Sequence, residues 1–460
     1  MVTMTVPGTS EVSLQATKAV VVAGVVDCEL LDGCCSVFGY DFRQGVIRIT
    51  SEPHARVAVT AITDSRLVFR PVDGTTFSVI PEEEEGVEGE MLQCPDAWFQ
   101  ICDRIVSGVP EGGDDGLRIL IQGPGSSGKS TLSRFVTNRF LSRVPQVAYL
   151  DCDVGQSEFT PCGNVSVIVV RKPVFGPPYS HQLAPQFSVH IGDVTPISNV
   201  RYYIDAIRKL LDTFDGSCPL VVNTMGWVDG LGADLLAAVT GLCRPQHIIQ
   251  ISPSTDSAPP RLPSYRPFEF HHVSSQTRGK RPQAAPSPRE YRSMGLAAYF
   301  LPDRSPFAGL NNVASSITSL PAYRIKFDDI RVRDLSGEAL HTSEKALYWL
   351  NGSLVALAVE VDEQDPFPNC LGLGIVRAVD LNDQCLYATT PLSLDQLEAV
   401  TCIIRGSIGI PADIALQADA SSLFHQPYKR AHPASNALGS FEMKTRHNVQ
   451  RHRGADADGA

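Results

Sequence analysis

Residues 119–131 read ILIQGPGSSGKST, and the types and spacing of these residues suit the binding of a phosphate group. A glycine followed, after four residues, by Gly-Lys-Ser is the phosphate-binding loop pattern. Its glycines let the backbone turn tightly and direct N–H groups at phosphate oxygens. Lys129 can place a positive charge on the β- and γ-phosphates, and the Ser130 hydroxyl can bind Mg²⁺. The pattern predicts a nucleotide-binding loop made of Gly123, Pro124, Gly125, Ser126, Ser127, Gly128, Lys129, Ser130 and Thr131.

The residues on either side of this loop favour a nucleotide site over a surface turn rich in glycine and serine. An apolar run at 117–121 reads as a buried strand leading into the loop. A helix is expected to begin at Thr131, so that its positive N-terminal end faces the same anion. The apolar residues at helical spacing that predict this helix are Leu132, Phe135, Val136, Phe140 and Leu141.

A second polar motif, DCDVGQ, begins at Asp151 and follows an apolar run at 146–150. A carboxylate at the end of a neighbouring strand can complete the coordination of Mg²⁺ beside a phosphate loop. It can also accept a proton from an attacking hydroxyl. Asp153 is the first choice for these roles, and the predicted Mg²⁺ ligands are Ser130, Asp151 and Asp153. The alternative is that both acids only cap a turn.

Two later motifs carry side chains suited to holding a nucleic acid or its phosphates. NTMGW at 223–227 follows another predicted strand, and Trp227 could stack on a nucleobase, although a buried core tryptophan is the commoner outcome. Arg289 and Arg292 are three residues apart and so share one helical face. Arginines above a phosphate site can neutralise charge on a transferring phosphoryl group. The alternative for this pair is a solvated helix face.

These residues must be positioned by a chain that divides into three folded parts and a tail. Residues 1–112 read as a β-rich domain. Residues 113–305 alternate strands and helices, which predicts an α/β, P-loop NTPase domain with a parallel sheet. Residues 306–425 return to β patterning as a mixed, β-rich C-terminal domain. Residues 426–460 are expected to be disordered.

The individual elements follow from runs of apolar residues between turn signals. The strands expected in the first domain are 18–26, 35–42, 46–50 and 56–62, before a helix near 98–105. In the second domain we expect strands at 164–170, 219–223 and 247–252, and helices at 199–214 and 233–239. The strands expected in the third are 354–361, 371–378, 384–389 and 399–404. An acidic run begins at Glu82, a linker spans 110–116, and residues 253–288, with the basic cluster 278–281, read as a long mobile insertion.

Composition narrows the classes of protein that the chain can belong to. Of the 460 residues, 43% are hydrophobic and 19% charged, which is typical of a globular protein without a membrane span. Since the net charge is −11, the chain is not a protein that coats nucleic acid through bulk positive charge. The 12 cysteines show no CxxC pair, so they suggest neither a zinc site nor a disulfide framework. They favour buried free thiols in a reducing compartment.

Four motifs occur in the order GPGSSGKST, DCDVGQSEFTP, PLVVNTMGW and Arg-x-x-Arg ending in Tyr-Phe. Together they resemble the polynucleotide 5′-hydroxyl kinase family, specifically its nucleolar, ribosomal-RNA-processing branch. The related RNA kinase of the pre-mRNA cleavage machinery shares the D-V-G-Q and lid features. The resemblance covers 117–305 and 345–416, and the N-terminal domain in outline. One departure is Cys162, where relatives usually have a second proline.

The resemblance implies an enzyme that uses ATP or GTP and Mg²⁺ to phosphorylate the 5′-hydroxyl end of RNA, or also of DNA. It implies a nuclear, nucleolar protein and an endonuclease partner that generates this end during ribosomal RNA maturation. The catalytic residues it implies are Lys129, Asp153, Arg289 and Arg292, with the arginines as a lid over the phosphates. The RNA-binding residues it implies are Gln156, Thr224 and Trp227.

Three other functions are alternatives to a polynucleotide kinase. The first is a non-catalytic, nucleotide-bound scaffold subunit of an RNA-processing complex, which would have little use for lid arginines. The second is a switch GTPase, which would need an Asn-Lys-x-Asp base-reading motif that we do not find. The third is a transport ATPase, whose LSGGQ-like signature is also absent.

Overall fold

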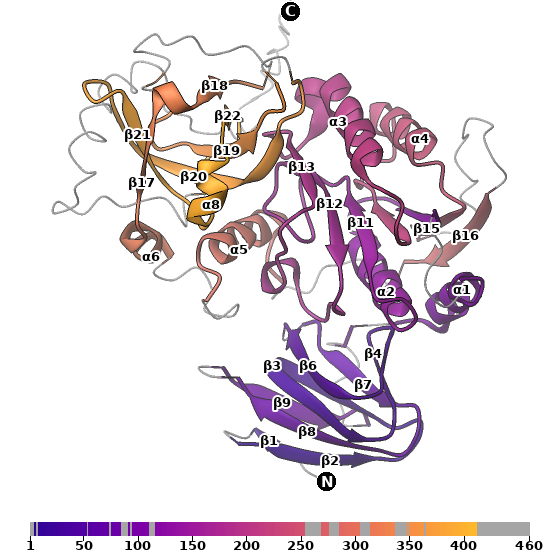
Figure 1. Cartoon of the computed structure of the whole chain (residues 1–460). Helices are drawn as coiled ribbons and strands as arrows, with labels where there is room; N and C mark the ends of the chain where they lie inside the picture. The colour runs from indigo at the N-terminus through magenta and orange to yellow at the C-terminus, as the bar shows by residue number, and fades with distance from the viewer. Residues whose placement is uncertain are drawn as a thin grey trace, which may run out of the picture.

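The computed structural model of the chain describes residues 4–5, 8–52, 54–72, 75–83, 91–92, 94–109, 116–253, 268–275, 285–303, 313–335, 347, 349–362 and 365–411. These residues form three β-sheets that follow one another along the chain (Figure 1). Four expected features lie outside the described residues: most of the acidic run after Glu83, the linker at 110–115, the basic cluster at 278–281 and the tail at 426–460. Among the described residues, no helix is long and apolar enough to cross a membrane.

The N-terminal sheet has nine strands, and its strand pairings are antiparallel, in agreement with the β-rich prediction. The long strand β3 (Ala19–Asp32) is its centre, because it pairs with four others. The remaining strands are β1 (Met4–Thr5), β2 (Ser10–Leu14), β4 (Cys35–Val37), β5 (Tyr40–Phe42), β6 (Gly45–Ser51), β7 (Val57–Ala61), β8 (Ser65–Pro71) and β9 (Phe77–Pro81).

The central sheet has seven strands in the order β13-β12-β11-β14-β10-β15-β16. Their bounds are β10 (Arg118–Gln122), β11 (Val147–Asp151), β12 (Asn164–Val170), β13 (Phe187–His190), β14 (Leu220–Asn223), β15 (His247–Ser252) and β16 (Glu269–Ser274). The strands β11, β14, β10, β15 and β16 run parallel, so their carboxyl ends meet at one edge. All of β11 and β14 is buried, as expected of parallel strands covered on both faces.

Two features of this sheet differ from the sequence prediction of a parallel sheet followed by a mobile insertion. β12 pairs antiparallel with β11, and β13 antiparallel with β12. The connection from β11 to β12 contains no helix, and a chain that returns without a crossover must pair antiparallel. The expected insertion at 253–288 also contains an ordered strand, β16, which extends the sheet beside β15.

Helices cover both faces of the central sheet. On one face lie α1 (Asp96–Ser107) and α2 (Lys129–Leu141), which share a core with Ile119, Ile121 and the N-terminal sheet. On the other face α3 (Val200–Thr213) and α4 (Leu231–Cys243) pack against Leu120. The alternation of side chains along β10 thus sends neighbouring residues into two separate cores.

Aromatic rings join the N-terminal sheet to α2. Phe135, fully buried on α2, makes edge-to-face contacts with Phe38 of the N-terminal domain and with Trp98 and Phe99 of α1. Such pairs are worth about 0.5–1.5 kcal/mol beyond the area they bury. The helix that follows the phosphate loop is therefore fixed to the N-terminal domain.

The C-terminal sheet has six strands in the order β17-β21-β20-β19-β22-β18 and is mixed, since β18 pairs parallel with β22. Its strands are β17 (Tyr323–Lys326), β18 (Arg331–Arg333), β19 (Leu354–Val359), β20 (Asn369–Asp380), β21 (Cys385–Thr389) and β22 (Cys402–Arg405). Helix α5 (Pro288–Phe300) leads into this domain, followed by α6 (Val313–Ser319). Leu296 and Phe300 of α5 belong to the core of this sheet, so α5 is anchored on it.

Candidate active site

The phosphate loop connects the end of β10 to the start of α2. Gly128 has φ 100°, which places it in the left-handed region just before the helix. A Cβ atom on Gly123 would lie 2.1 Å from the Ile251 carbonyl oxygen, so only glycine fits there. The helix begins at Lys129, two residues before the expected Thr131. Its first N–H groups thus belong to the Lys-Ser-Thr segment itself.

Lys129 is buried, with only 6% of its surface exposed. Its Nζ donates a 2.9 Å hydrogen bond to the Pro124 carbonyl oxygen within the loop. Burial lowers the pKa of Lys129 to about 8, although the nearby charge of Asp153 acts in the opposite direction. The ammonium group is therefore poorly solvated, and an incoming phosphate would be a better partner than the carbonyl it now contacts.

Asp153 lies where the charges of Lys129 and Arg292 both act on it. Burial raises the pKa of Asp153, while Lys129, two backbone hydrogen bonds and Arg292 oppose that rise. The two backbone donors are the N–H groups of Gly155 and Gln156, at 3.0 and 3.1 Å from the same carboxylate oxygen, Oδ1. This links a lysine of the loop, an aspartate of the DCDVGQ motif and an arginine of α5 electrostatically.

Asp151 has a different environment from Asp153. Its carboxylate is fully buried at the end of β11 and accepts hydrogen bonds from Glu158 N (2.7 Å), Asp153 N (3.2 Å) and Asn223 Nδ2 (3.2 Å). Burial raises the pKa of Asp151 to about 8. Asn223 in turn accepts a hydrogen bond from Ser133 of α2. Asp151 thus fixes the shape of the acidic loop and ties it to β14.

The NTMGW motif brings its glycine against the phosphate loop. A Cβ atom on Gly226 would lie 2.6 Å from Gly125 Cα and 3.0 Å from Lys129 Nζ, so a glycine is required for this approach. Trp227 is half-buried and packs against the α3–α4 core. Thr224 is buried and donates its hydroxyl to the Ile121 carbonyl oxygen at 2.8 Å. This contact links the residue after β14 to strand β10.

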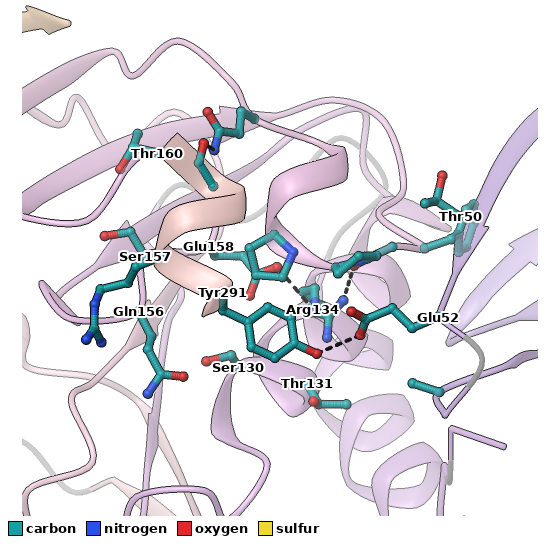
Figure 2. A pocket seen from close by; sticks show the side chains of 18 of the residues that line it. Thr50, Glu52, Ser130, Thr131, Arg134, Gln156, Ser157, Glu158, Thr160 and Tyr291 are labelled. Atoms are coloured by element: carbon teal, nitrogen blue, oxygen red, sulfur yellow. Dashed lines mark hydrogen bonds and ion pairs between the residues drawn. The ribbon is translucent and has the colours of Figure 1, made fainter. Parts of the chain in front are cut away.

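A cavity opens beside the first turn of α2, under helix α5 (Figure 2). It brings together four of the predicted residues, Ser130, Thr131, Gln156 and Arg292. The N-terminal domain contributes Thr50 and Glu52 to the wall opposite. Arg289 does not line it and is exposed in the first turn of α5. The two arginines of the predicted pair therefore have different surroundings.

One buried carboxylate that lines this cavity, Glu52, was not predicted from the sequence. Glu52 accepts a hydrogen bond of 2.7 Å from the Tyr291 hydroxyl (Figure 2). It accepts another of 2.7 Å from the Tyr179 hydroxyl and lies 3.2 Å from His54 Nε2. Burial opposes ionisation, but His54 and the two tyrosines hold the pKa of Glu52 below its ordinary value. No local sequence pattern predicts this group, because the two tyrosines that bind Glu52 lie 127 and 239 residues away in sequence.

A second unpredicted group, Glu158, also lines the cavity. Glu158 is almost fully buried and pairs with Arg134 of α2 at 3.3 Å and with His181 at 2.9 Å. Burial lowers the pKa of His181, while Glu158 opposes that shift. Glu158 stands two residues after DCDVGQ, within the longer motif DCDVGQSEFTP. This position is the one sequence signal that points to it.

A phosphate loop between a parallel strand and a helix, with an acidic strand end beside it, defines a P-loop NTPase domain. The comparison with family models agrees: residues 123–301 match "mRNA cleavage and polyadenylation factor CLP1 P-loop", and residues 318–411 match "NOL9-like, C-terminal domain". A solved structure, the wild-type Clp1p–Pcf11p complex, matches with a TM-score of 0.55 at 14% identity. It covers 89% of this chain and 99% of that chain, which shows a shared fold.

Relatives in sequence identify the family. The Arabidopsis thaliana polynucleotide 5′-hydroxyl-kinase NOL9 is 31% identical over 320 residues, which are 64% of this chain and 85% of that protein. The Mus musculus protein of the same name is 28% identical over 351 residues, 64% of this chain and 48% of that protein. The chain belongs to the NOL9 family of polynucleotide 5′-hydroxyl-kinases, which confirms the resemblance, and it spans about half the length of the mouse relative.

Proposed function

We propose that this chain is a polynucleotide 5′-hydroxyl kinase that transfers the γ-phosphate of ATP or GTP to the 5′-hydroxyl end of RNA. The observation that carries the proposal is that the charges of Lys129 on the phosphate loop and of Arg292 on α5 both act on Asp153, while Arg292, Ser130 and Gln156 line one cavity. A phosphoryl transfer needs a cation on the phosphates, a carboxylate near the attacking hydroxyl and further positive charge on the transferring group. These three elements come here from three separate segments of the chain.

In this proposal the phosphate loop binds the nucleotide through its backbone N–H groups and Lys129. Mg²⁺ would be held by Ser130 and Asp153, since hydroxyl and carboxylate oxygens are the donors that this ion prefers. When bound, the ion neutralises charge that develops on the β- and γ-oxygens. Asp151, whose oxygens already accept three hydrogen bonds, is proposed to orient the loop that carries Asp153.

The acceptor end of the RNA is proposed to lie between the acidic loop and helix α5. Asp153 would accept the proton of the 5′-hydroxyl, and Gln156 is exposed on the same loop. Trp227 would stack on the terminal base from the side of the NTMGW motif. Arg292 lines the cavity and Arg289 does not, so Arg292 is the better placed of the two lid arginines.

The cellular role is a further part of the proposal. We propose that the kinase acts in the maturation of ribosomal RNA in the nucleolus, with an endonuclease partner that supplies the 5′-hydroxyl end. A chain with a net charge of −11 suits the binding of one strand end better than the coating of a long duplex.

The test is transfer of labelled phosphate. The purified chain, with Mg²⁺ and γ-labelled ATP or GTP, is expected to label a 5′-hydroxyl oligoribonucleotide, and Lys129→Ala is expected to abolish labelling. Tight nucleotide binding without any labelling, alone and with the nuclease partner present, would instead indicate a non-catalytic scaffold subunit.

A further inference from the structure

Two histidines and a glutamate converge at the edge of the central sheet, on strands β15 and β16. His247 Nδ1 lies 3.3 Å from His271 Nε2, and Glu269 Oε2 lies 3.8 Å from each of these two nitrogens. Each side chain thus offers one ligand atom to a common point, and the three atoms lie within 4.8 Å of one another. Imidazole and carboxylate groups in this number are a familiar ligand set for zinc.

The strand pairing explains why the three side chains meet. β15 and β16 are parallel neighbours, with His247 directly opposite Glu269 and Ile249 opposite His271. Residues 269 and 271 are two apart on one strand, so their side chains leave the same face of the sheet. The site therefore rests on two hydrogen-bonded strands, a rigid support of the kind that metal sites require.

The separation of the ligand atoms fits a tetrahedral ion. Two ligand atoms at about 2.0–2.1 Å from zinc lie roughly 3.3 Å apart in tetrahedral geometry. The two histidine nitrogens already have this separation. The Glu269 side chain is 62% exposed, so it is free to close its remaining gap of about half an ångström. A water molecule would take the fourth position on the solvent side.

The surroundings of the three side chains suit a cation. The side chains of His247 and His271 are 15% and 8% exposed, so their ring nitrogens are shielded from solvent, whereas the Glu269 side chain is 62% exposed. Two imidazoles with a carboxylate at their edge are a donor set for a cation rather than for an anion.

We propose that His247, Glu269 and His271 form a binding site for one Zn²⁺ ion. The site lies at the amino ends of β15 and β16, whereas the phosphate loop lies at the carboxyl ends of the parallel strands (Figure 1). It is therefore separate from the Mg²⁺ site of the proposed kinase and does not depend on that function. The ion ties the edge strand β16 to β15.

The link between β15 and β16 also affects the phosphate loop, because the end of β16 leads to a contact with that loop. The residue after β16, Ser275, donates its hydroxyl to the Ser127 carbonyl oxygen at 2.9 Å. Fixing the amino end of β16 restrains the strand whose other end supports the loop. We expect the ion to stabilise this edge of the sheet, so that its loss lowers thermal stability.

Zinc binding to the purified full chain tests the proposal. After removal of metals with a chelator, the protein is titrated with Zn²⁺ against a competing dye, and metal content is measured by mass spectrometry. We expect one tightly bound Zn²⁺ per chain, a higher melting temperature with Zn²⁺, and affinity reduced roughly 10-fold or more in Glu269→Gln and His271→Gln.

The matched control is His272, the next residue on β16, which faces the opposite side of the sheet and hydrogen-bonds Ser252. His272→Gln should retain the zinc affinity of the wild type. Since Glu269 is largely exposed, its substitution tests the site even if a histidine variant unfolds. Wild-type protein without stoichiometric zinc, or zinc binding that Glu269→Gln and His271→Gln leave unchanged, would overturn the proposal.

Discussion

The Tyr291 hydroxyl donates a 2.7 Å hydrogen bond to the Glu52 carboxylate, joining helix α5 to the N-terminal domain. The next residue on α5, Arg292, lines the cavity beside the phosphate loop. The N-terminal domain thus positions the helix that carries the proposed lid arginine. Because Glu52 also binds Tyr179 and His54, this contact belongs to a fully paired buried group.

Removing the Tyr291 hydroxyl tests how much this hydrogen bond contributes to stability and to phosphate transfer. Tyr291→Phe is expected to lower the free energy of unfolding by about 1.5–3 kcal/mol, the usual contribution of a hydrogen bond to a charged group. Phosphate transfer should fall as well, through kcat more than through the KM for ATP. Urea unfolding and steady-state kinetics measure the two effects. Tyr323→Phe, in the C-terminal sheet, is the control, and equal effects of both variants would contradict the account.

The acid dependence of stability gives a second test of Glu52. Since its pKa is lower in the folded protein than its ordinary 4.5, its contribution is fully present above pH 4.5 and is lost as the pH falls through the folded value. The difference in unfolding free energy between wild type and Glu52→Gln should therefore shrink below pH 4.5. Unfolding measured between pH 3 and 7 would show this, and a difference that is constant across the range would contradict it.

The buried Lys129 is expected to lower the free energy of unfolding of the free protein, although phosphate transfer requires it. Burial lowers its pKa to about 8 from 10.5, so between these values the unfolded state binds more protons and stability rises with pH. At pH 7 the full penalty applies, and Lys129→Met should stabilise the free protein by about 1–3 kcal/mol while abolishing transfer. The exposed Lys172→Met is the control. A destabilised Lys129→Met protein would contradict this interpretation of the buried ammonium.

Substitutions of the two lid arginines, Arg289 and Arg292, should differ in their effect on phosphate transfer. Arg292 faces the cavity and acts on Asp153, whereas Arg289 is exposed. We expect Arg292→Ala to reduce kcat by roughly 10³-fold, in the range of arginines that stabilise phosphoryl transfer. Arg289→Ala should have a much smaller effect. Single-turnover transfer measures both, and a larger loss for Arg289→Ala would reverse the assignment.

Trp227 can act in the core or on the RNA, and kinetics distinguishes these roles. Trp227→Ala should raise the KM for the oligonucleotide roughly 5- to 100-fold, as expected for loss of one stacked base, with little change in nucleotide binding. Trp349→Ala, which removes an exposed ring stacked on Arg405, is the control. Equal loss of oligonucleotide and nucleotide binding would identify Trp227 as a packing residue.

Local sequence was sufficient for the elements whose chemistry lies in one segment. The phosphate loop needs its glycines, lysine and hydroxyls in one short run, and the buried strands β12 and β15 coincide with the predicted ranges 164–170 and 247–252. Helix α2 begins two residues early because Gly128 adopts a left-handed conformation that a pattern of apolar residues does not reveal.

Features that depend on pairing between distant segments were beyond the sequence. The antiparallel direction of β12 is decided by a helix-free connection, and β16 is short enough to be hidden in a polar segment. Glu52, Tyr179 and Tyr291 come from three separate parts of the chain, and none lies in a recognisable motif. The same holds for His247 and His271, which only strand register brings together.

Transfer of phosphate to a 5′-hydroxyl end, with Asp153 as the proton acceptor, can be measured directly. The experiment compares wild type with Asp153→Asn on two oligoribonucleotides that differ only in a 5′-hydroxyl or a 5′-phosphate. The control is Asp229→Asn, exposed on the loop after Trp227. We expect γ-label on the 5′-hydroxyl oligonucleotide alone, with a loss of roughly 10²–10⁴-fold in Asp153→Asn only. Full transfer by Asp153→Asn, or no transfer by wild-type protein that binds nucleotide, would contradict this expectation.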